Sequence, residues 1–239
     1  AINQMIFDVA NDPAVNSTPV LKYPKMRNWD YYQNFDYAAG FNGAVTDGNN
    51  QESVSEDINF WNGVILWGAA TGQQALMEHG ICHYAALVHT SWTYWFDPAG
   101  MTAQLAQESG GPAQTNWPGP AASRLFDAYT RFDTFFGVHA AYGTGIVMIP
   151  ITGGSFYHNL CNTDFVKTVM QTYDKHVTDF SIDPLNPVGH NAFDGLNQWI
   201  NGPGKFYALF AKYYAMSDPT NAIAKYWNVP SNYDTAGTP

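Results

Sequence analysis

Two glutamates four residues apart are the residues best suited to chemistry in this sequence. Glu52 and Glu56 follow a Gly- and Asn-rich turn that begins at Asp47. In a helix that begins near Asn50 they would lie one turn apart on the same face, because residues four apart are helical neighbours. Such a carboxylate pair suits general acid and base work on a glycosidic bond. Glu52 is the better candidate for the base, since the helix dipole in a first turn favours the ionised form.

The other residues of this helix indicate which face packs. Val54, Ile58, Trp61 and Ile65 form an apolar stripe that is displaced from the glutamates by roughly 200° around the helix axis. This stripe can anchor the helix while the carboxylates point away from it, and Asn59 extends the glutamate face. The alternative is a solvated helix face, on which a Glu-x-x-x-Glu pair is common.

The residues around the pair narrow the choice. The run from Asn49 to Glu56, NNQESVSE, resembles the signature Asn-Gln-Glu-Ser-x-Ser-Glu of the family 81 glycoside hydrolases, which are endo-β-1,3-glucanases. The resemblance implies that Glu52 is the base of an inverting hydrolysis and that Glu56 is also needed in the site. Asn50, Gln51 and Asn59 are then candidate substrate-binding residues beside the carboxylates.

A segment that precedes the pair resembles the same family in part. Arg27 to Asp30 matches an Arg-x-aromatic-Asp pattern, and the four residues from Asn34 to Tyr37 stand where the family has Gly-His-Ser-Trp. The family histidine is absent, but Asp36 brings a carboxylate to the same place. Asp36, Tyr37 and Trp29 are candidate substrate-binding residues, with core packing as the alternative for each aromatic ring.

Two later segments also fit the resemblance to a family 81 glycoside hydrolase. The stretch from Ile149 to Ser155 resembles the family segment Pro-Val/Ile-Thr-x-x-Ser. The long loop rich in Gly and Pro from Gly100 to Pro120 carries Trp117, a candidate platform for sugar stacking, because long ordered loops are commonly functional.

The resemblance also implies what this sequence does not contain. In the family the general acid is an aspartate well upstream of the glutamate signature, and this chain has no counterpart to it. The chain therefore looks like the carboxyl half of a catalytic domain, completed by another chain, a proteolytic partner or residues outside this sequence. A rearranged, self-contained helical domain is the alternative. A second hypothesis is a catalytically inactive carbohydrate-binding or extracellular structural protein derived from the same fold.

Helical periodicity dominates the sequence and predicts an all-α fold joined by long loops of Gly, Pro and aromatic residues. The resemblance implies part of an (α/α)6 toroid. The first two predicted helices are 52–71, which Gly72 ends, and 73–87. A third carries Leu125, Phe126, Tyr129, Phe132, Phe135 and Phe136, and a fourth is capped by Asn162. The remaining predicted helices are 191–200, 205–215 and a short one after Asp218 that ends near Trp227. The predicted division begins with an extended lead-in over 1–26 that continues from an upstream part and in which Ile6 to Ala10 can end a helix before an extended crossing. A catalytic-type helical domain over 27–229 and a loose tail over 230–239 follow.

Composition limits the possible partners. The formal net charge of −10 argues against binding to nucleic-acid phosphates but does not oppose a neutral polysaccharide such as β-1,3-glucan. Few charged residues and many Asn, Gln, Ser and Thr are typical of secreted proteins. The sequence contains no apolar run of about 18 residues, so no membrane span is expected.

Neither a metal nor an organic cofactor is expected. His79 and His83 stand at ligand spacing, but no acidic residue accompanies them as in a zinc hydrolase. Cys82 and Cys161 are the only cysteines; they could form a disulfide in an exported protein or remain two thiols.

Overall fold

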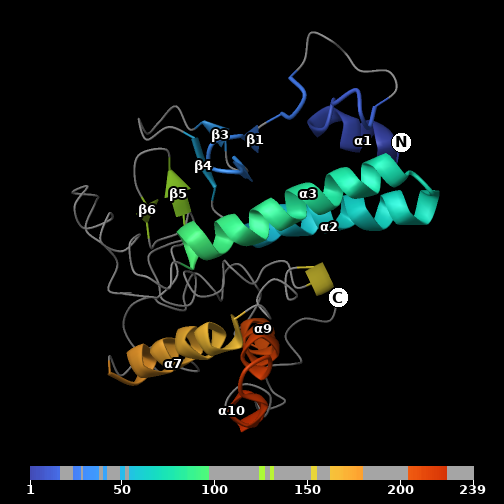
Figure 1. Ribbon diagram of the computed structural model, residues 1–239. Coiled ribbons are helices and arrows are strands. Elements are labelled where there is room, and N and C mark those ends of the chain that lie inside the picture. The colour runs from blue at the N-terminus through green and yellow to red at the C-terminus, as the bar shows by residue number, and fades with distance from the viewer. Residues whose placement is uncertain are drawn as a thin grey trace.

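The structure is a computed structural model that describes most of the amino-terminal third of the chain and several later segments. In the described part, helices predominate and fall into two groups (Figure 1): α1 to α3 with the short strands, and α7, α9 and α10. The predicted predominance of helices is confirmed, and the toroid arrangement stays a prediction. The described residues are 1–16, 24–27, 29–37, 40–41, 49–51, 54–96, 124–126, 130–131, 152–154, 162–179 and 204–224.

The central element is an antiparallel hairpin of α2 (Val54–Thr71) and α3 (Gln74–Thr90). The turn between them contains Gly72, whose φ of 67° is a left-handed conformation that glycine adopts without strain. The two helices approach closely at Gly68, where an added Cβ atom would lie only 2.6 Å from the backbone nitrogen of Met77. The predicted end of the first helix at Thr71 is therefore confirmed.

A π-helix, η1 (Ser91–Trp95), continues α3 without a break. Its aromatic residues link the two helix groups, since Trp92 packs edge-to-face on Phe165 with 5.3 Å between ring centroids. Phe96 contacts the same ring of Phe165 at 5.4 Å. The helix predicted over 73–87 therefore extends further than predicted, and the predicted loop from Gly100 to Pro120 lies outside the described residues.

A small β-hairpin lies across the carboxyl-terminal part of α3. It consists of β1 (Trp29–Asp30) and β2 (Phe35–Asp36), which pair antiparallel. Asp30 Oδ1 accepts hydrogen bonds from the backbone N–H groups of Tyr32 at 2.7 Å and Gln33 at 2.8 Å, which fixes the turn. Asn34 stands at φ 59°, in the place where the family segment has glycine, and asparagine is the residue besides glycine that best tolerates this conformation.

Two sequence predictions about the second sheet are wrong. This sheet has the order β3 (Gly40–Phe41), β4 (Asn49–Gln51), β5 (Arg124–Phe126) and β6 (Thr130–Arg131). The helix start near Asn50, which would put Glu52 and Glu56 on one face, does not occur because β4 runs to Gln51, and the helix expected to carry Leu125 and Phe126 is replaced at these residues by β5. The pairing of Asn50 with Phe126 and of Gln51 with Leu125 is a contact between distant residues that no local pattern reveals. Aromatic residues also favour strands, so their helical spacing was misleading.

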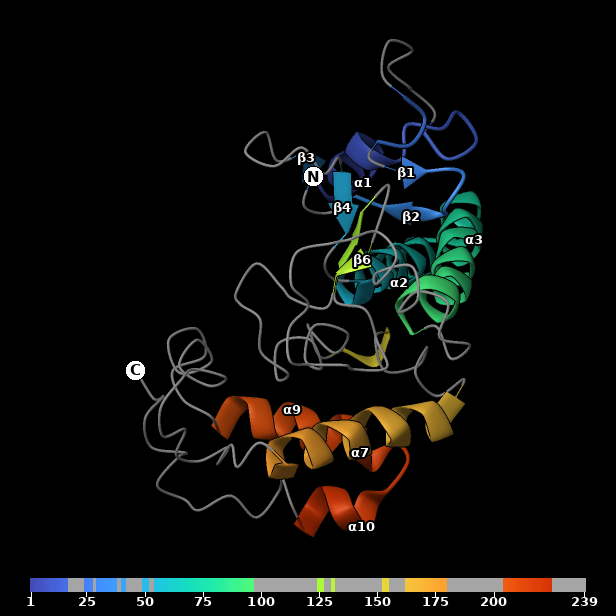
Figure 2. The same ribbon diagram turned by 90° about the vertical axis from the view of Figure 1, so that its left-hand side faces the viewer.

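The carboxyl-terminal helices agree better with the sequence. They are α7 (Thr163–Asp179), α9 (Gly204–Ala215) and α10 (Pro219–Ala222), and they lie below the α2–α3 hairpin in both views (Figure 2). Asn162 Oδ1 accepts the backbone N–H of Phe165 at 3.0 Å, which confirms the predicted cap of α7. Asp218 caps α10 by accepting the backbone N–H of Asn221 at 3.1 Å. The predicted helix over 191–200 lies outside the described residues.

The lead-in over 1–26 begins with a helix and folds back on the hairpin. Helix α1 (Ile2–Val9) contacts α2 through Asn3, whose Oδ1 accepts the indole N–H of Trp67 at 2.7 Å. Arg27 pairs with Asp8, and Ala10 forms a β-bridge with Met26. The predicted helix end within Ile6 to Ala10 is confirmed, while the predicted domain division stays untested.

Aromatic side chains fill the core of both helix groups. Among the described residues, the largest fully buried side chains are those of Trp61, Trp95, Tyr213, Tyr214, Phe35, Phe96, Phe210, Ile58, Leu76 and Leu87. None of the helices in the described ranges combines the length and the apolar character that a bilayer crossing requires. Cys82 is an exposed free thiol, and Cys161 lies outside the described residues.

Candidate functional site

The junction between β4 and α2 carries the glutamate pair. Glu56 lies in the first turn of α2 and is exposed, whereas Val54, Ile58 and Trp61 are buried to within 1% exposure. The apolar stripe therefore packs as predicted, and Glu56 points away from it. Glu52 lies outside the described residues. Its predicted place one turn before Glu56 stays a prediction.

The face of α2 that carries Glu56 brings together polar groups from a distant segment. Thr152 Oγ1 donates a hydrogen bond to Oδ1 of Asn59, which is three residues from Glu56 and hence its helical neighbour. Thr152 belongs to the stretch whose sequence resembles a second family segment. The structure thus brings Thr152, from a segment that resembles the family, to the helix that begins with the glutamate signature. The two bonded residues, Asn59 and Thr152, are 93 residues apart in the sequence.

An exposed aromatic ring lies beside Glu56 on the same helix. Phe60 follows Glu56 by four residues, and 38% of its surface is exposed. Its ring packs edge-to-face on the buried Trp61 with 5.0 Å between centroids. An apolar ring held rigidly next to a carboxylate can stack on a sugar. The sequence analysis did not single out Phe60, although its spacing of four residues from Glu56 was a signal that could have marked it.

Two of the predicted sugar-contacting rings are buried. Trp29 packs on Trp61 and His83, with centroid distances of 6.0 Å and 4.5 Å. Tyr37 packs on Phe35 and donates a hydrogen bond to Asp30 Oδ2 at 2.9 Å. These contacts are the core packing that the sequence left open as the alternative. A role for either ring in substrate binding stays a prediction.

Asn50 and Gln51 lie in β4, immediately before the glutamate pair, and are paired with β5. Their backbones are therefore held in a sheet; β4 ends at Gln51 and α2 begins at Val54. Asn59 and Thr152 meet on the face of α2 that carries Glu56. Asp36 lies against α2 through contacts with Asp57 and Trp61. Trp117 lies outside the described residues.

Asp36 contacts α2 through two hydrogen bonds. Its backbone N–H donates to Asp57 Oδ2 at 3.0 Å, and its Oδ2 accepts the indole N–H of Trp61 at 3.2 Å. Asp57 is buried, with 6% of its surface exposed. Sequence reasoning missed Asp57. The signal was its position one turn before Trp61 and three residues after Val54, which places an acid within the apolar stripe.

The two histidines of α3 pack against this region. His83 stacks on Trp61 with 4.4 Å between centroids, and His79 contacts His83 at 4.5 Å. Burial, followed by the nearby His79, lowers the pKa of His83 to about 4. Burial also lowers the pKa of His79, although Asp12 opposes that shift. Within the described ranges, no set of three metal-ligating side chains comes together.

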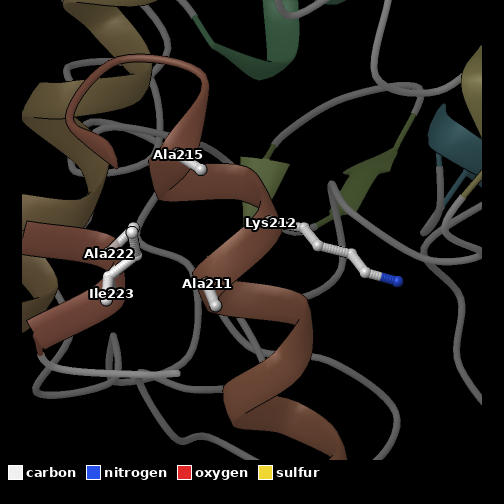
Figure 3. Close-up of a pocket in the computed structure, with 5 residues that line it drawn as sticks. All are labelled: Ala211, Lys212, Ala215, Ala222 and Ile223. Atoms are coloured by element: carbon white, nitrogen blue, oxygen red, sulfur yellow. The ribbon is translucent and has the colours of Figure 1, made fainter. Parts of the chain in front are cut away.

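A groove of about 390 Å³ lies elsewhere, between α9 and α10. Figure 3 shows its lining, in which Lys212 extends away from the side occupied by Ala222 and Ile223. The lining is almost entirely apolar and contains no carboxylate, so this groove lacks the chemistry of the predicted site. The lining residues are Ala211, Lys212, Ala215, Ala222 and Ile223.

Comparison with known proteins defines the class. The sequence model described as the glycosyl hydrolase family 81 C-terminal domain matches residues 1–227. A solved structure described as a glycoside hydrolase family 81 protein from Clostridium thermocellum, in a glutamate-to-alanine mutant, superposes with a TM-score of 0.63 at 26% identity. The match covers 94% of this chain and 26% of that one.

Similar sequences agree with that match. A glucan endo-1,3-β-D-glucosidase of Acetivibrio thermocellus is 43% identical over 158 residues, which is 65% of this chain and 18% of the relative. The glucan endo-1,3-β-D-glucosidase 2 of Saccharomyces cerevisiae is 27% identical over 190 residues, 80% of this chain and 22% of the relative. This chain belongs to glycosyl hydrolase family 81, and the part of the family that it represents is the C-terminal domain. It spans only about a fifth of the length of these relatives.

Proposed function

We propose that this chain is the carboxyl part of the catalytic domain of an endo-β-1,3-glucanase that inverts the anomeric centre, with Glu52 as general base. The observation that carries the proposal is the signature NNQESVSE, which ends at an exposed carboxylate in the first turn of α2. The relatives named as glucan endo-1,3-β-D-glucosidases support the substrate class.

In this proposal Glu56 positions the attacking water or tunes Glu52. Support comes from the surroundings of Glu56, where Asn59 and Thr152 supply polar groups and Phe60 supplies an exposed ring. A base in an inverting enzyme must activate a water on the face of the sugar opposite the leaving group. Glu56 lies in the first turn of α2, where the helix dipole favours an ionised side chain, so it can orient that water for Glu52.

The general acid is an aspartate of an upstream part in this proposal. Inversion needs a second carboxyl group at about 6.5–9.5 Å from the base, on the other side of the scissile bond. The amino-terminal half of the domain, or a partner chain, supplies this group. The chain's share of about a fifth of the length of its relatives is compatible with such a missing part.

The proposed substrate and location follow from charge and composition. A neutral β-1,3-glucan is not repelled by a net charge of −10, and hydrolysis by two carboxylates requires no metal or organic cofactor. We propose that the protein acts outside the cell, where such polysaccharides are found.

The deciding experiment is Glu52→Gln in the full-length protein, with reducing-sugar release from laminarin as the readout. Glu78→Gln is the matched control, because Glu78 is exposed on α3 and accepts a hydrogen bond only from its helical neighbour Gln74 among the contacts that the structure describes. We expect Glu52→Gln to abolish release with an unchanged unfolding transition, and Glu78→Gln to retain it. Turnover retained in Glu52→Gln removes Glu52 from the role. Laminarin binding without any release by the unmodified protein favours the inactive carbohydrate-binding alternative.

A further inference from the structure

One glycine of the α2–α3 hairpin has no packing partner that explains it. A Cβ atom at Gly68 would lie 2.6 Å from the backbone nitrogen of Met77. A Cβ atom at Gly80 would lie 2.9 Å from Cγ1 of Ile65, so close packing explains both of these glycines. Gly63 is an exposed residue in the interior of α2, and an added Cβ atom there meets no described atom within 4 Å. Glycine weakens a helix relative to alanine, so α2 gives up stability at this position without a gain in packing among the described residues.

The missing side chain leaves the helix surface beside Phe60 open. Side chains on a helix lean towards its amino terminus and cover the preceding turn. A side chain at position 63 would therefore cover the surface near Phe60, which lies three residues earlier and is 38% exposed. Phe60 in turn follows Glu56 by four residues, on the same side of α2. Phe60 and Gly63 thus form one exposed surface, the stacking surface, which continues along α2 from the glutamate turn.

The ring of Phe60 is held in place from below. It packs edge-to-face on the buried Trp61 with 5.0 Å between ring centroids. Trp61 is fixed in turn by His83, which stacks on it at 4.4 Å, and by Asp36 Oδ2, which accepts its indole N–H at 3.2 Å. A ring that is already held loses little conformational freedom when a ligand stacks on it. The stacking surface is therefore preorganised for a flat apolar face.

Polar groups border the stacking surface along one side. Thr152 donates a hydrogen bond to Asn59, which directly precedes Phe60. A Cβ atom at Gly154 would lie 2.7 Å from Cγ of Asn62, which directly precedes Gly63. The segment 152–154 therefore runs beside both members of the surface. An apolar ring bordered by amide and backbone groups is the usual composition of a small-molecule site.

The charge of α2 favours a neutral ligand. From Ile58 to Thr71 the helix contains no charged residue, so the stacking surface offers no cation to an anionic partner. A sugar ring has apolar C–H faces and a rim of hydroxyl groups, which match an aromatic ring bordered by amides. A neutral polysaccharide therefore suits this surface better than a nucleic acid or an acidic peptide does.

We propose that Phe60 and Gly63 form a glucose-binding subsite next to Glu56. One sugar ring of a neutral β-glucan chain stacks on Phe60 and occupies the space that Gly63 leaves open. Both residues bind substrate and take no part in proton transfer. The identity of the sugar rests on the proposed function, whereas the open stacking surface does not.

Gly63→Gln in the full-length protein is the sharpest test, because stability and binding should change in opposite directions. Glutamine is a better helix former than glycine, so the unfolding midpoint without glucan should be unchanged or higher. Its side chain would cover the surface beside Phe60. We expect the affinity for a β-1,3-linked glucose hexasaccharide to fall roughly tenfold, and KM on laminarin to rise by a similar factor while kcat is retained. A residue with a purely structural role would not separate stability from binding in this way.

The second test removes or keeps the ring itself. Phe60→Ala should also weaken hexasaccharide binding roughly tenfold, and Phe60→Tyr should retain it because the ring remains. Leu66→Ala is the matched control, since Leu66 is 62% exposed on the same helix but lies roughly 120° away from Phe60 around the axis. Its affinity and KM should equal those of the unmodified protein.

The outcomes separate this proposal from the proposed function. An unchanged hexasaccharide affinity in Gly63→Gln or in Phe60→Ala overturns the subsite. A lower unfolding midpoint of Gly63→Gln also overturns it, because an upstream part of the protein would then pack on the stacking surface in place of a sugar. If the unmodified protein binds the hexasaccharide but releases no sugar, the proposed hydrolysis is refuted, and the affinities of the variants still decide the subsite. An unmodified protein that binds no glucan overturns both.

Discussion

Tyr84 donates a hydrogen bond from its hydroxyl group to the backbone carbonyl oxygen of Gly154 at 3.0 Å. Gly154 is also close to α2, since a Cβ atom at this position would lie 2.7 Å from Cγ of Asn62. The segment 152–154 therefore lies against both helices of the hairpin, and it delivers Thr152 to Asn59 beside Glu56. This contact joins the helical hairpin to a segment that is far away in the sequence.

Gly154→Ala should weaken this junction. The new methyl group would meet Asn62 at less than the separation that real Cβ atoms show, so we expect a loss of about 1–3 kcal/mol in the free energy of unfolding, the typical cost of overpacking. Denaturant unfolding measures it. Gly63→Ala is the matched control, because a Cβ atom there meets no described atom within 4 Å. It should stabilise α2 by about 0.5–1 kcal/mol, since alanine is the better helix former. Equal effects of both substitutions would contradict the close approach.

Glu56→Gln should slow hydrolysis without unfolding the protein. Glu56 is exposed, so the substitution removes no core contact, and we expect it to act mainly on the attacking water and on Glu52. In the full-length protein we expect kcat on laminarin to fall by roughly 10²-fold, the lower end of what positioned acid and base groups contribute. The same assay on Glu78→Gln provides the baseline. A variant as active as that control would exclude Glu56 from the site.

His83 should make the protein less stable in acid. Burial and the nearby His79 lower the pKa of His83 from 6.5 to about 4, so the folded chain binds this proton less readily than the unfolded chain. The buried neutral His83 therefore adds to the free energy of unfolding above pH 6.5, and this contribution is lost as the pH falls towards about 4. His83→Phe keeps a ring against Trp61 and should flatten this part of the profile.

The control for the histidine is His89→Gln, because His89 is an exposed residue of the same helix. Its profile should follow that of the unmodified chain. If His83→Phe retained the full acid sensitivity, the loss would originate from other groups, and the buried imidazole would not be its source.

Local patterns predicted the helices well because helix contacts span only one turn. The stripe of Val54, Ile58 and Trp61 is buried as its spacing required, and Gly72 ends α2 where a left-handed residue is needed. The cap at Asn162 was equally readable, since it involves a backbone group three residues away. The signature from Asn49 to Glu56 was readable in the same way, as a run of consecutive residues, and the family match agrees with it.

Sequence reasoning failed where distant residues pair. Leu125 and Phe126 have helical spacing but form a strand, because β4 provides a pairing edge that lies more than 70 residues away. Asp57 resembled an ordinary acid in a first turn, and only the fold shows that Asp36 lies against it. Trp29 and Tyr37 were candidates for sugar contact, yet neighbouring rings bury both.

By itself, the sequence determined the family signature, the predominance of helices and the packing face of α2. These depend on residue type and short spacing, which act through contacts within one or two helical turns. Only the tertiary structure decided which polar groups meet around Glu56, which aromatic rings are buried and which acid lies behind the glutamate turn. Those outcomes depend on contacts between segments tens of residues apart, whose pairing is set by the burial and hydrogen bonding of the whole fold.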